Sequence, residues 1–228
     1  MSKGSIIEIR GLRKTFRVGK VDVEALRGID LEVESGEFLS IVGPSGSGKS
    51  TLFHIIGGLT PPTAGAVRVA NQDLTLLGDA GRTRLRKTTV GFVFQKFNLL
   101  PILTAGDNIA LARDIGGNRE GESARFRDVL ELLGISERLK HKPSALSGGE
   151  QQRVAIARGI VNHPAILLAD EPTGNLDSQN SQTVLALLRD LNERLGQTIL
   201  MITHNPEAAA YAHRIVNMRD GRIVSSDR

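Results

Sequence analysis

A glycine-rich stretch of the chain has the composition of a site that binds phosphate groups. It runs from Gly43 to Thr51 and reads Gly-Pro-Ser-Gly-Ser-Gly-Lys-Ser-Thr. Glycines let the backbone fold tightly, so that successive N–H groups point at one anion, and Lys49 adds a positive charge for the outer phosphates of a nucleotide. The hydroxyl of Ser50 is a suitable ligand for Mg²⁺. The candidate phosphate-binding residues are Gly43, Pro44, Ser45, Gly46, Ser47, Gly48, Lys49, Ser50 and Thr51.

Two adjacent carboxylates, Asp170 and Glu171, follow an apolar run at residues 165–169. Such a run predicts a buried parallel strand, and its carboxyl end is the edge at which α/β sheets place their ligand contacts. Neighbouring residues of a strand point to opposite sides, so we expect the two carboxylates to have different roles. Asp170 suits the coordination shell of Mg²⁺, and Glu171 suits a base that polarises the attacking water.

Two further polar residues follow buried strands. Gln95 comes after residues 90–94, and His204 comes after residues 198–203. If these strands belong to one parallel sheet, both side chains lie at its ligand-binding edge. The pattern alone leaves alternatives open, because Gln95 could equally cap its strand and His204 could be a histidine without a ligand.

Ser147-Gly148-Gly149-Glu150 is a second candidate site for an anion. Ser and Glu at this spacing form a capping box, which predicts that a helix begins at Ser147. Each glycine inside a helix costs about 1 kcal/mol relative to alanine, so the pair indicates that something approaches the backbone closely. A helix N-terminus with free N–H groups binds anions, although an ordinary cap remains the alternative.

The elements around these residues predict an α/β chain. Residues 38–42 read as a buried strand before the phosphate loop, and the loop leads into a helix that begins near Lys49. Alternating residues at 5–40 predict short antiparallel strands joined by turns. A longer helix with an apolar stripe ends at Gly196. The remaining expected elements are a strand at 66–69 and a closing hairpin at 215–224.

Residues 96–160 differ from the rest and predict a helical insertion. One helix should carry Ile109, Leu111 and Ala112, and a second should run from Phe126 to a stop at Gly134. Residues 114–123 between them are rich in glycine and predict the most flexible stretch. Before this insertion lies a basic run that favours a solvated face, with a specific anion site as the alternative, formed by Arg82, Arg84, Arg86 and Lys87.

Phe16 stands in a turn among basic residues, Lys14 and Arg17. An aromatic residue in such a stretch is most often part of the core. Its basic neighbours leave room for the alternative, a ring on which a nucleotide base stacks.

The composition limits the classes of function. The chain has 228 residues, no cysteine and a formal net charge of +4, so disulfides and thiolate metal sites are excluded. No apolar run is long enough for a membrane span, and residues 1–5 lack the apolar core of a signal peptide. The basic pI keeps nucleic acid among possible partners, but aromatic residues make up only 4% of the chain, which argues against a surface that stacks bases.

Taken together, the phosphate loop, Gln95, the Ser147–Glu150 signature, the strand ending in Asp170 and Glu171, and His204 resemble an ABC-type ATPase in kind and order. The resemblance covers nearly the whole chain. It implies a phosphate-loop fold with a mostly parallel sheet, an N-terminal antiparallel β subdomain and an inserted helical subdomain. The implied division is a core of residues 5–95 and 161–228 and a helical subdomain of residues 96–160, all within a single domain of residues 1–228.

The resemblance also implies ATP and Mg²⁺ as cofactors, ATP hydrolysis, and a head-to-tail homodimer with two ATP molecules between the chains. In such a dimer Ser147, Gly148, Gly149 and Glu150 face the γ-phosphate of the ATP that the partner holds. Site roles are implied for the residues that match the family's motifs. These are Lys49, Glu171 and His204 in catalysis, Ser50, Gln95 and Asp170 at the metal, Asp177 between the two sites, and Phe16, where the family more often has tyrosine, on the adenine.

A narrower likeness is carried by residues 97–104 and 170–177. They resemble the branch of the family that serves macrolide efflux and lipoprotein release, with relatives in cell division. The likeness implies a separate integral membrane permease-type subunit as partner, a location on the cytoplasmic face of the inner membrane, and no nucleic acid. The alternatives are a soluble ABC-type ATPase that acts on DNA or ribosomes, and an ATPase that regulates cell division without moving cargo.

Overall fold

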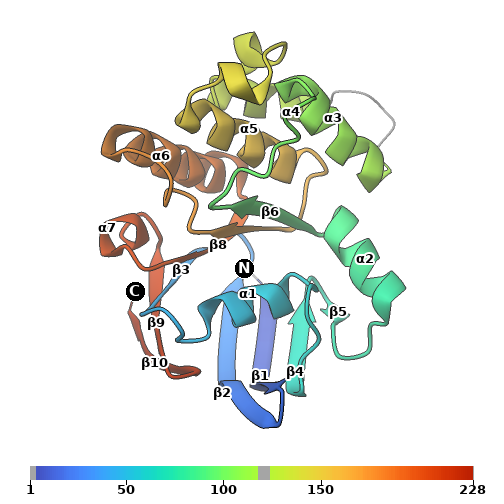
Figure 1. Cartoon of the computed structure of the whole chain (residues 1–228), viewed down its shortest axis with the longest axis vertical. Coiled ribbons are helices and arrows are strands. Elements are labelled where there is room, and N and C mark those ends of the chain that lie inside the picture. Colours follow the sequence, from blue (N-terminus) through green and yellow to red (C-terminus); the bar gives the residue numbers. More distant parts are fainter. Residues whose placement is uncertain (1–3, 118–123, 228) are drawn as a thin grey trace.

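Two β-sheets and the helices around them make up the computed structural model, which describes residues 4–117 and 124–227 (Figure 1). The smaller sheet is antiparallel, has the strand order β2–β1–β4–β5, and stands at the bottom of the view in Figure 1. Its strands are β1 (Ser5–Val18), β2 (Val21–Glu34), β4 (Ala64–Val69) and β5 (Gln72–Asp73).

The larger sheet has the order β10–β9–β3–β8–β7–β6, and all neighbouring pairs except β10–β9 are parallel. The carboxyl ends of the parallel strands therefore lie at one edge, where Val42 pairs with Thr203 and Asp170 pairs with Ile202. The strands are β3 (Phe38–Val42), β6 (Val90–Phe94), β7 (Ile166–Asp170), β8 (Thr198–Thr203), β9 (Arg214–Arg219) and β10 (Arg222–Asp227).

The larger sheet is covered on both faces, which explains why β7 and β8 are apolar throughout. Leu168 and Leu200 pack into a core shared with α1 and the smaller sheet, whereas Leu167 and Ile199 pack into a core shared with α3 to α6. Figure 1 shows α1 between the two sheets and α3 to α6 on the far side of the larger sheet. The helices are α1 (Lys49–Ile56), α2 (Asp79–Thr88), α3 (Ala105–Gly116), α4 (Ala124–Leu132), α5 (Gly148–Ile160), α6 (Ser178–Leu195) and α7 (Pro206–Ala209).

The predicted strands around the phosphate loop, Gln95, Asp170 and His204 are all present, and so are the long helix that ends at Gly196 and the closing hairpin. The prediction of short strands at residues 5–40 is wrong. Two strands of 14 residues each cover this segment. Gly19 and Gly36 lie in turns as predicted, but Gly11 marks a bulge, because the pairing register shifts between Ile9 and Leu12 and the N–H of Gly11 donates to Asp30 Oδ1 at 2.8 Å.

The basic run before β6 is helix α2, which the sequence pattern did not predict because Leu85 is its one buried residue. A purely solvated face is also the wrong interpretation. Arg82 and Arg86 are half-buried and donate to the carbonyl oxygens of Leu77 and Gly58, both at 2.6 Å. Two side chains of this helix therefore fasten it to the neighbouring loops.

Helix α3 is longer than expected. Residues 114–116 belong to its last turn, so that part of the stretch predicted to be flexible is helical, while residues 118–123 lie outside the described residues. Ile109 is buried as predicted, but Leu111 is 39% exposed. Across residues 4–117 and 124–227, none of the helices combines the length and the apolar character needed to cross a membrane.

Candidate functional site

The phosphate loop connects β3 to the first turn of α1 and leaves that helix without a side-chain cap. Gly48 occupies the cap position with φ of 100°, and a Cβ there would lie 2.7 Å from the carbonyl oxygen of Ala25, so only glycine fits. The first N–H groups of α1 therefore have no side-chain cap as acceptor. The positive end of the helix dipole adds to their attraction for an anion. Such a helix end binds phosphate.

Lys49 folds back over the loop. Its Nζ donates to the carbonyl oxygens of Gly43 at 2.6 Å and of Pro44 at 2.9 Å. Burial lowers the pKa of Lys49, and the nearby charges of Glu171 and Asp170 oppose this shift. The carbonyl groups of the loop thus hold the ammonium group of Lys49 close enough to interact with both acids.

A cleft of about 300 Å³ brings three predicted segments together. Its walls come from the phosphate loop, from the two acids at the end of β7 and from the histidine after β8, and Ala25 of β2 and Ile202 of β8 complete it. The shared edge of the parallel strands explains this convergence, because it carries the ends of β3, β7 and β8 to the same place. The predicted residues that line the cleft are Ser45, Gly46, Ser47, Gly48, Lys49, Ser50, Thr51, Asp170, Glu171 and His204.

Asp170 is the last residue of β7 and is half-buried. Burial raises its pKa, the charge of Glu171 raises it further, and His54 and Lys49 act in the opposite direction. Within the described part of the chain its carboxylate accepts no hydrogen bond. A carboxylate that has lost water without gaining a donor is stabilised by a cation, and the Ser50 hydroxyl lines the same cleft. Two oxygen donors of this kind fit a Mg²⁺ ion.

Glu171 adopts a left-handed backbone conformation with φ of 44°. This conformation costs about 1–2 kcal/mol for a residue with a side chain, and hydrogen bonds from the end of β8 offset it. The N–H of Glu171 donates to Ile202 O at 2.9 Å, while its carboxylate accepts from Thr203 Oγ1 at 2.9 Å and from His204 N at 2.8 Å. The ring atom His204 Nδ1 also lies 2.7 Å from Glu171 Oε1. The two residues therefore act as one hydrogen-bonded unit at the mouth of the cleft.

The Ser147–Glu150 signature begins α5 and does not line this cleft. Figure 1 shows α5 and α1 on opposite faces of the larger sheet. The predicted capping box is confirmed, because Ser147 Oγ accepts from Glu150 N at 3.2 Å and Glu150 Oε2 accepts from Ser147 N at 2.8 Å. These bonds, with the ion pair to Arg138, lower the pKa of Glu150 to about 2.

Contacts within the chain explain why position 149 is glycine, and the sequence did not indicate them. A Cβ at this position would lie 2.2 Å from Asn180 Oδ1 of α6, so packing between α5 and α6 requires glycine there. At Gly148 a Cβ would meet Leu176 Cδ2 at 3.3 Å, a contact that is only tight. The side chain of Ser147 is exposed at this helix end.

The comparisons with known proteins agree with this geometry. Residues 26–174 match a family model described as "ABC transporter". This match covers more than half of the chain. The chain belongs to the ABC transporter family.

Several members of the ABC transporter family are similar over nearly the whole chain. A "Macrolide export ATP-binding/permease protein MacB" of Syntrophobacter fumaroxidans is 48% identical over 96% of the chain, which spans only 31% of that relative. A "Lipoprotein-releasing system ATP-binding protein LolD" of Geobacter metallireducens is 46% identical over 97% of the chain and 99% of its own length. The chain thus corresponds to about a third of one kind of relative and to all of another.

A solved structure supports the same family. It is described as the "Dimeric structure of a post-hydrolysis state of the ATP-binding cassette MJ0796 bound to ADP and Pi", and MJ0796 comes from Methanocaldococcus jannaschii. The two chains superpose with a TM-score of 0.86 at 40% identity, covering 97% of this chain and 98% of the other. The predicted fold, family and enzyme class are therefore confirmed: this is an ATPase of the ABC transporter family.

Besides Gly43, Pro44 and the Ser147–Glu150 signature, three predicted site residues of this ABC ATPase lie outside the cleft. Gln95 follows β6 and pairs with Asn175, since Asn175 Nδ2 donates to Gln95 O at 3.0 Å and Gln95 Nε2 donates to Asn175 Oδ1 at 3.4 Å. Asp177 caps α6 by accepting from Asn180 N at 2.8 Å, and this bond lowers its pKa. In this structure both residues are held by partners within the chain.

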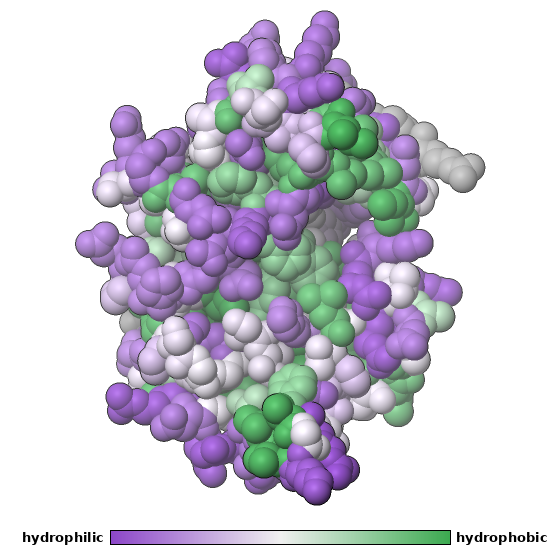
Figure 2. Space-filling model, viewed as in Figure 1, coloured by the Kyte–Doolittle hydropathy of each residue, from purple (hydrophilic) through white to green (hydrophobic). Residues whose placement is uncertain are grey.

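Phe16 is the third of these residues, and the favoured interpretation that it belongs to the core is wrong. Its side chain is 40% exposed near the tip of the β1–β2 hairpin, where it pairs across the strands with Val23. Figure 2 shows an apolar cluster at this end of the molecule, at the bottom of the view. The Nζ of Lys14 lies 4.9 Å from the centre of the ring, so a base stacked on Phe16 would use the ring's other face.

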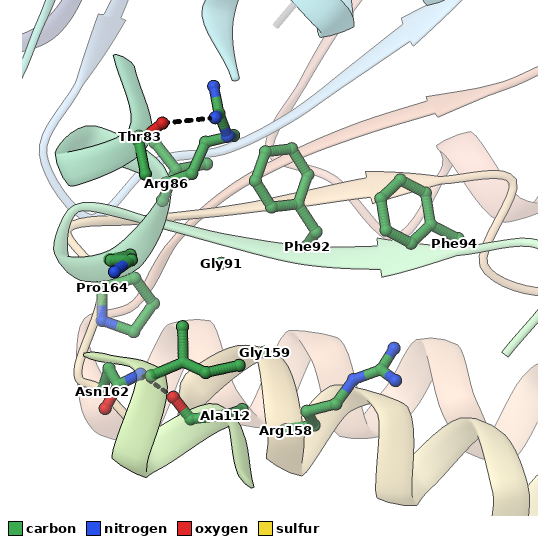
Figure 3. Close-up of a pocket in the computed structure, with 13 residues that line it drawn as sticks. Thr83, Arg86, Gly91, Phe92, Phe94, Ala112, Arg158, Gly159, Asn162 and Pro164 are labelled. Carbon is green, nitrogen blue, oxygen red and sulfur yellow. Dashed lines mark hydrogen bonds between the residues drawn. The ribbon is translucent and has the colours of Figure 1, made fainter. Parts of the chain in front are cut away.

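Two features of the structure were not predicted from the sequence. The first is Thr203, whose hydroxyl contacts Glu171; the signal was a hydroxyl residue directly before His204 at the end of a buried strand. The second is a cavity of about 410 Å³ between α2, β6, α3 and α5 (Figure 3). No pattern in the sequence indicated it, because its walls come from four separate segments.

Proposed function

We propose that the chain binds ATP with Mg²⁺ in the cleft and works as the ATPase subunit of a membrane complex. The observation that supports this most directly is the convergence of Lys49, Asp170 and Glu171 on one cleft at the N-terminus of α1. The phosphate loop and Lys49 hold the triphosphate. Glu171 accepts a proton from the attacking water, and His204 orients Glu171 and reaches towards the γ-phosphate.

Ser50, Asp170 and Gln95 are the residues that would hold Mg²⁺. When bound, the ion neutralises charge that develops on the phosphate oxygens. Ser50 and Asp170 line the cleft already, whereas Gln95 must leave Asn175 to reach it. Gln95 is therefore the one member of the set whose side chain moves on loading.

Two chains form the complete site in a head-to-tail homodimer. Ser147 and the two glycines lie at the N-terminus of α5, on the other face of the sheet from α1, and the glycine N–H groups of this helix end suit the γ-phosphate of a second copy. The dimeric MJ0796 structures support such an assembly. In it, Asp177 lies between the two sites and Phe16 stacks on the adenine.

A test of this assignment uses the purified chain with ATP and Mg²⁺. The rate per chain should rise with protein concentration, since a monomer binds ATP but lacks the donors of its partner. Glu171→Gln should abolish the activity at every concentration. A rate per chain that is independent of concentration at levels well below the dimer dissociation constant would contradict the shared site.

The partner that we propose is an integral membrane subunit, with export, lipoprotein release or mechanical work as the outcome. Relatives named as a permease fusion and as part of a lipoprotein-releasing system support this. The chain would then be peripheral on the cytoplasmic face of the membrane. Residues 96–160 would move as a helical subdomain when the dimer closes.

The second cavity is the docking place that we propose for this subunit. Figure 3 shows the rings of Phe92 and Phe94 side by side along β6, with Arg86 and Arg158 on either side of that strand. Ile115 of α3 is 53% exposed at the cavity, and an apolar area covers this part of α3 at the upper right of Figure 2. An apolar side chain next to a carboxylate would match these walls.

Affinity purification from detergent-solubilised cells tests the docking place. Ile115→Glu in the tagged chain should lose the co-purifying membrane protein and keep ATP binding. Val224→Glu is the matched control, because Val224 is 61% exposed on β10 and does not line the cavity. Equal recovery of the membrane protein with both variants would exclude this surface.

A further inference from the structure

Thr203 is buried at the end of β8 and contacts the carboxylate of Glu171. Only 1% of its surface is exposed, although its side chain is polar. Its Oγ1 lies 2.9 Å from Glu171 Oε2 and 3.1 Å from Asn205 N. Buried hydroxyl groups are hydrogen-bonded, and here one partner follows β7 and the other lies in the segment after β8.

The direction of the hydroxyl proton follows from these two contacts. A backbone N–H can only donate, so the hydroxyl oxygen accepts from Asn205, and its single proton points at Glu171. Asn205 is itself fixed, because its Oδ1 accepts from Glu207 N at 2.8 Å and caps α7. The donor that faces Glu171 is therefore held in place by the end of β8 and the start of α7.

The two oxygens of the Glu171 carboxylate thus have separate donors. Oε2 accepts from Thr203, while Oε1 accepts from His204 N at 2.8 Å and faces the His204 ring. Without Thr203, a carboxylate held at one oxygen could rotate about its last bond. A catalytic group must keep its geometry within about 0.5 Å, so such rotation would slow proton transfer.

We propose that Thr203 is a positioning residue for Glu171, and that its hydroxyl orients the carboxylate towards the water that attacks ATP. The inference rests on the proposed role of Glu171 as the base. It assigns to Thr203 an effect on the chemical step and none on ATP binding, since Thr203 does not line the phosphate cleft.

The experiment compares two threonines of the same strand. Thr203→Val removes the hydroxyl and keeps the shape, and Thr203→Ser keeps the hydroxyl. Thr198→Val is the matched control, because Thr198 is 2% exposed at the other end of β8 and its hydroxyl accepts from Gly36 N at 2.9 Å. For each variant, kcat, the dissociation constant for ATP and the thermal unfolding midpoint are measured on the full chain.

We expect Thr203→Val to lower kcat about ten- to a hundredfold while ATP affinity changes less than about twofold. Thr203→Ser should recover kcat to within about threefold of the wild type, and Thr198→Val should stay within about twofold. A merely structural role would lower the unfolding midpoint of both valine variants and would not separate their kcat values.

Two results would overturn the inference. One is equal kcat for Thr203→Val and Thr198→Val at equal ATP binding, and the other is a serine variant as slow as the valine variant. Glu171→Gln in the same series separates this failure from that of the proposed function. If Glu171→Gln is inactive while Thr203→Val is fully active, only the proposed role of Thr203 is contradicted. If Glu171→Gln keeps full activity, the proposed role of Glu171 as the base is contradicted as well.

Discussion

Helices α1 and α5 both begin in glycine-rich segments, yet their N-termini are built in opposite ways. At α1 the cap is Gly48, with no side-chain hydrogen bond, and the loop before it curls around the space in front of the helix. At α5 the cap is Ser147, and in the reciprocal capping box the backbone N–H groups of Ser147 and Glu150 each donate to the other residue's side chain. One helix end is left open, and the other is partly closed by its own residues.

The difference teaches how two anion sites can divide one task. The open end of α1 has the acids of β7 and the histidine after β8 beside it, so binding and chemistry meet there. The capped end of α5 has neither, but its backbone is held by the capping box and its serine is exposed. In the dimer that we propose, α1 holds the nucleotide and α5 presents donors to the nucleotide of the other chain.

The largest expected effect separates chemistry from assembly. Glu171→Gln should lower the ATPase rate by about 10²- to 10⁴-fold, the usual contribution of a positioned base. ATP binding and ATP-dependent dimer formation should remain, because the phosphate loop and α5 are unchanged. The measurements are phosphate release and sedimentation with ATP, with Glu193→Gln on the surface of α6 as control. If Glu171→Gln stayed monomeric with ATP, the proposed separation of chemistry at α1 from assembly at α5 would be contradicted.

The next effect concerns the open helix end. Lys49→Ala should weaken ATP binding about ten- to a hundredfold, since a charged hydrogen bond contributes about 1.5–3 kcal/mol. The variant should also fail to dimerise at ATP concentrations that dimerise Glu171→Gln. Titration calorimetry and sedimentation measure the two quantities. Equal sedimentation of both variants with ATP would show that the two helix ends do not divide the task in this way.

A smaller effect is expected at the capped end. Ser147→Ala should leave ATP binding by dilute monomer within about twofold, because α5 does not line that chain's cleft. It should weaken ATP-dependent dimerisation about tenfold, the value of one lost hydrogen bond, and cost about 1 kcal/mol of stability through the lost cap. A matching loss of ATP affinity in the monomer would place Ser147 in its own chain's site and contradict the division.

The smallest effect is the pH dependence of the cap. The pKa of Glu150 in the folded chain is about 2, below its value of 4.5 in the absence of interactions. The contribution of Glu150 to the free energy of unfolding is therefore complete above pH 4.5 and is lost as the pH falls towards 2. Because its ion-pair partner Arg138 is exposed and solvent screens the pair, we expect about 1 kcal/mol. Urea unfolding of wild type and Glu150→Gln should converge at low pH, whereas Glu131→Gln on α4 should follow the wild type throughout.

Much of the cleft could be predicted because its parts are local in the sequence. The glycines with Lys49 and Ser50 specify a phosphate loop in any strand–loop–helix unit. The apolar run before Asp170 specifies a buried parallel strand, and parallel strands share one ligand-binding edge. The capping box at Ser147 was predictable for the same reason, since all its bonds join residues three positions apart.

What was missed depends on contacts between distant segments. The two long strands β1 and β2 were predicted as short ones, because only their pairing shows that glycine there makes a bulge. Helix α2 has a single buried residue, so its sequence has no apolar stripe from which a helix could be predicted. The reason for Gly149 lies on α6, where Asn180 fills the space that a side chain would need.

The sequence by itself determined the family, the order of the elements and the chemistry of each residue in the cleft, because local patterns encode helix ends, buried strands and phosphate loops. Only the tertiary structure decided which of these residues meet. Thr203 and Glu171 are 32 positions apart, and the pairing of β7 with β8 makes their contact possible. The same fold places α1 and α5 on opposite faces of one sheet, and that separation is why the glycine-rich ends of the two helices cannot serve the same nucleotide within one chain.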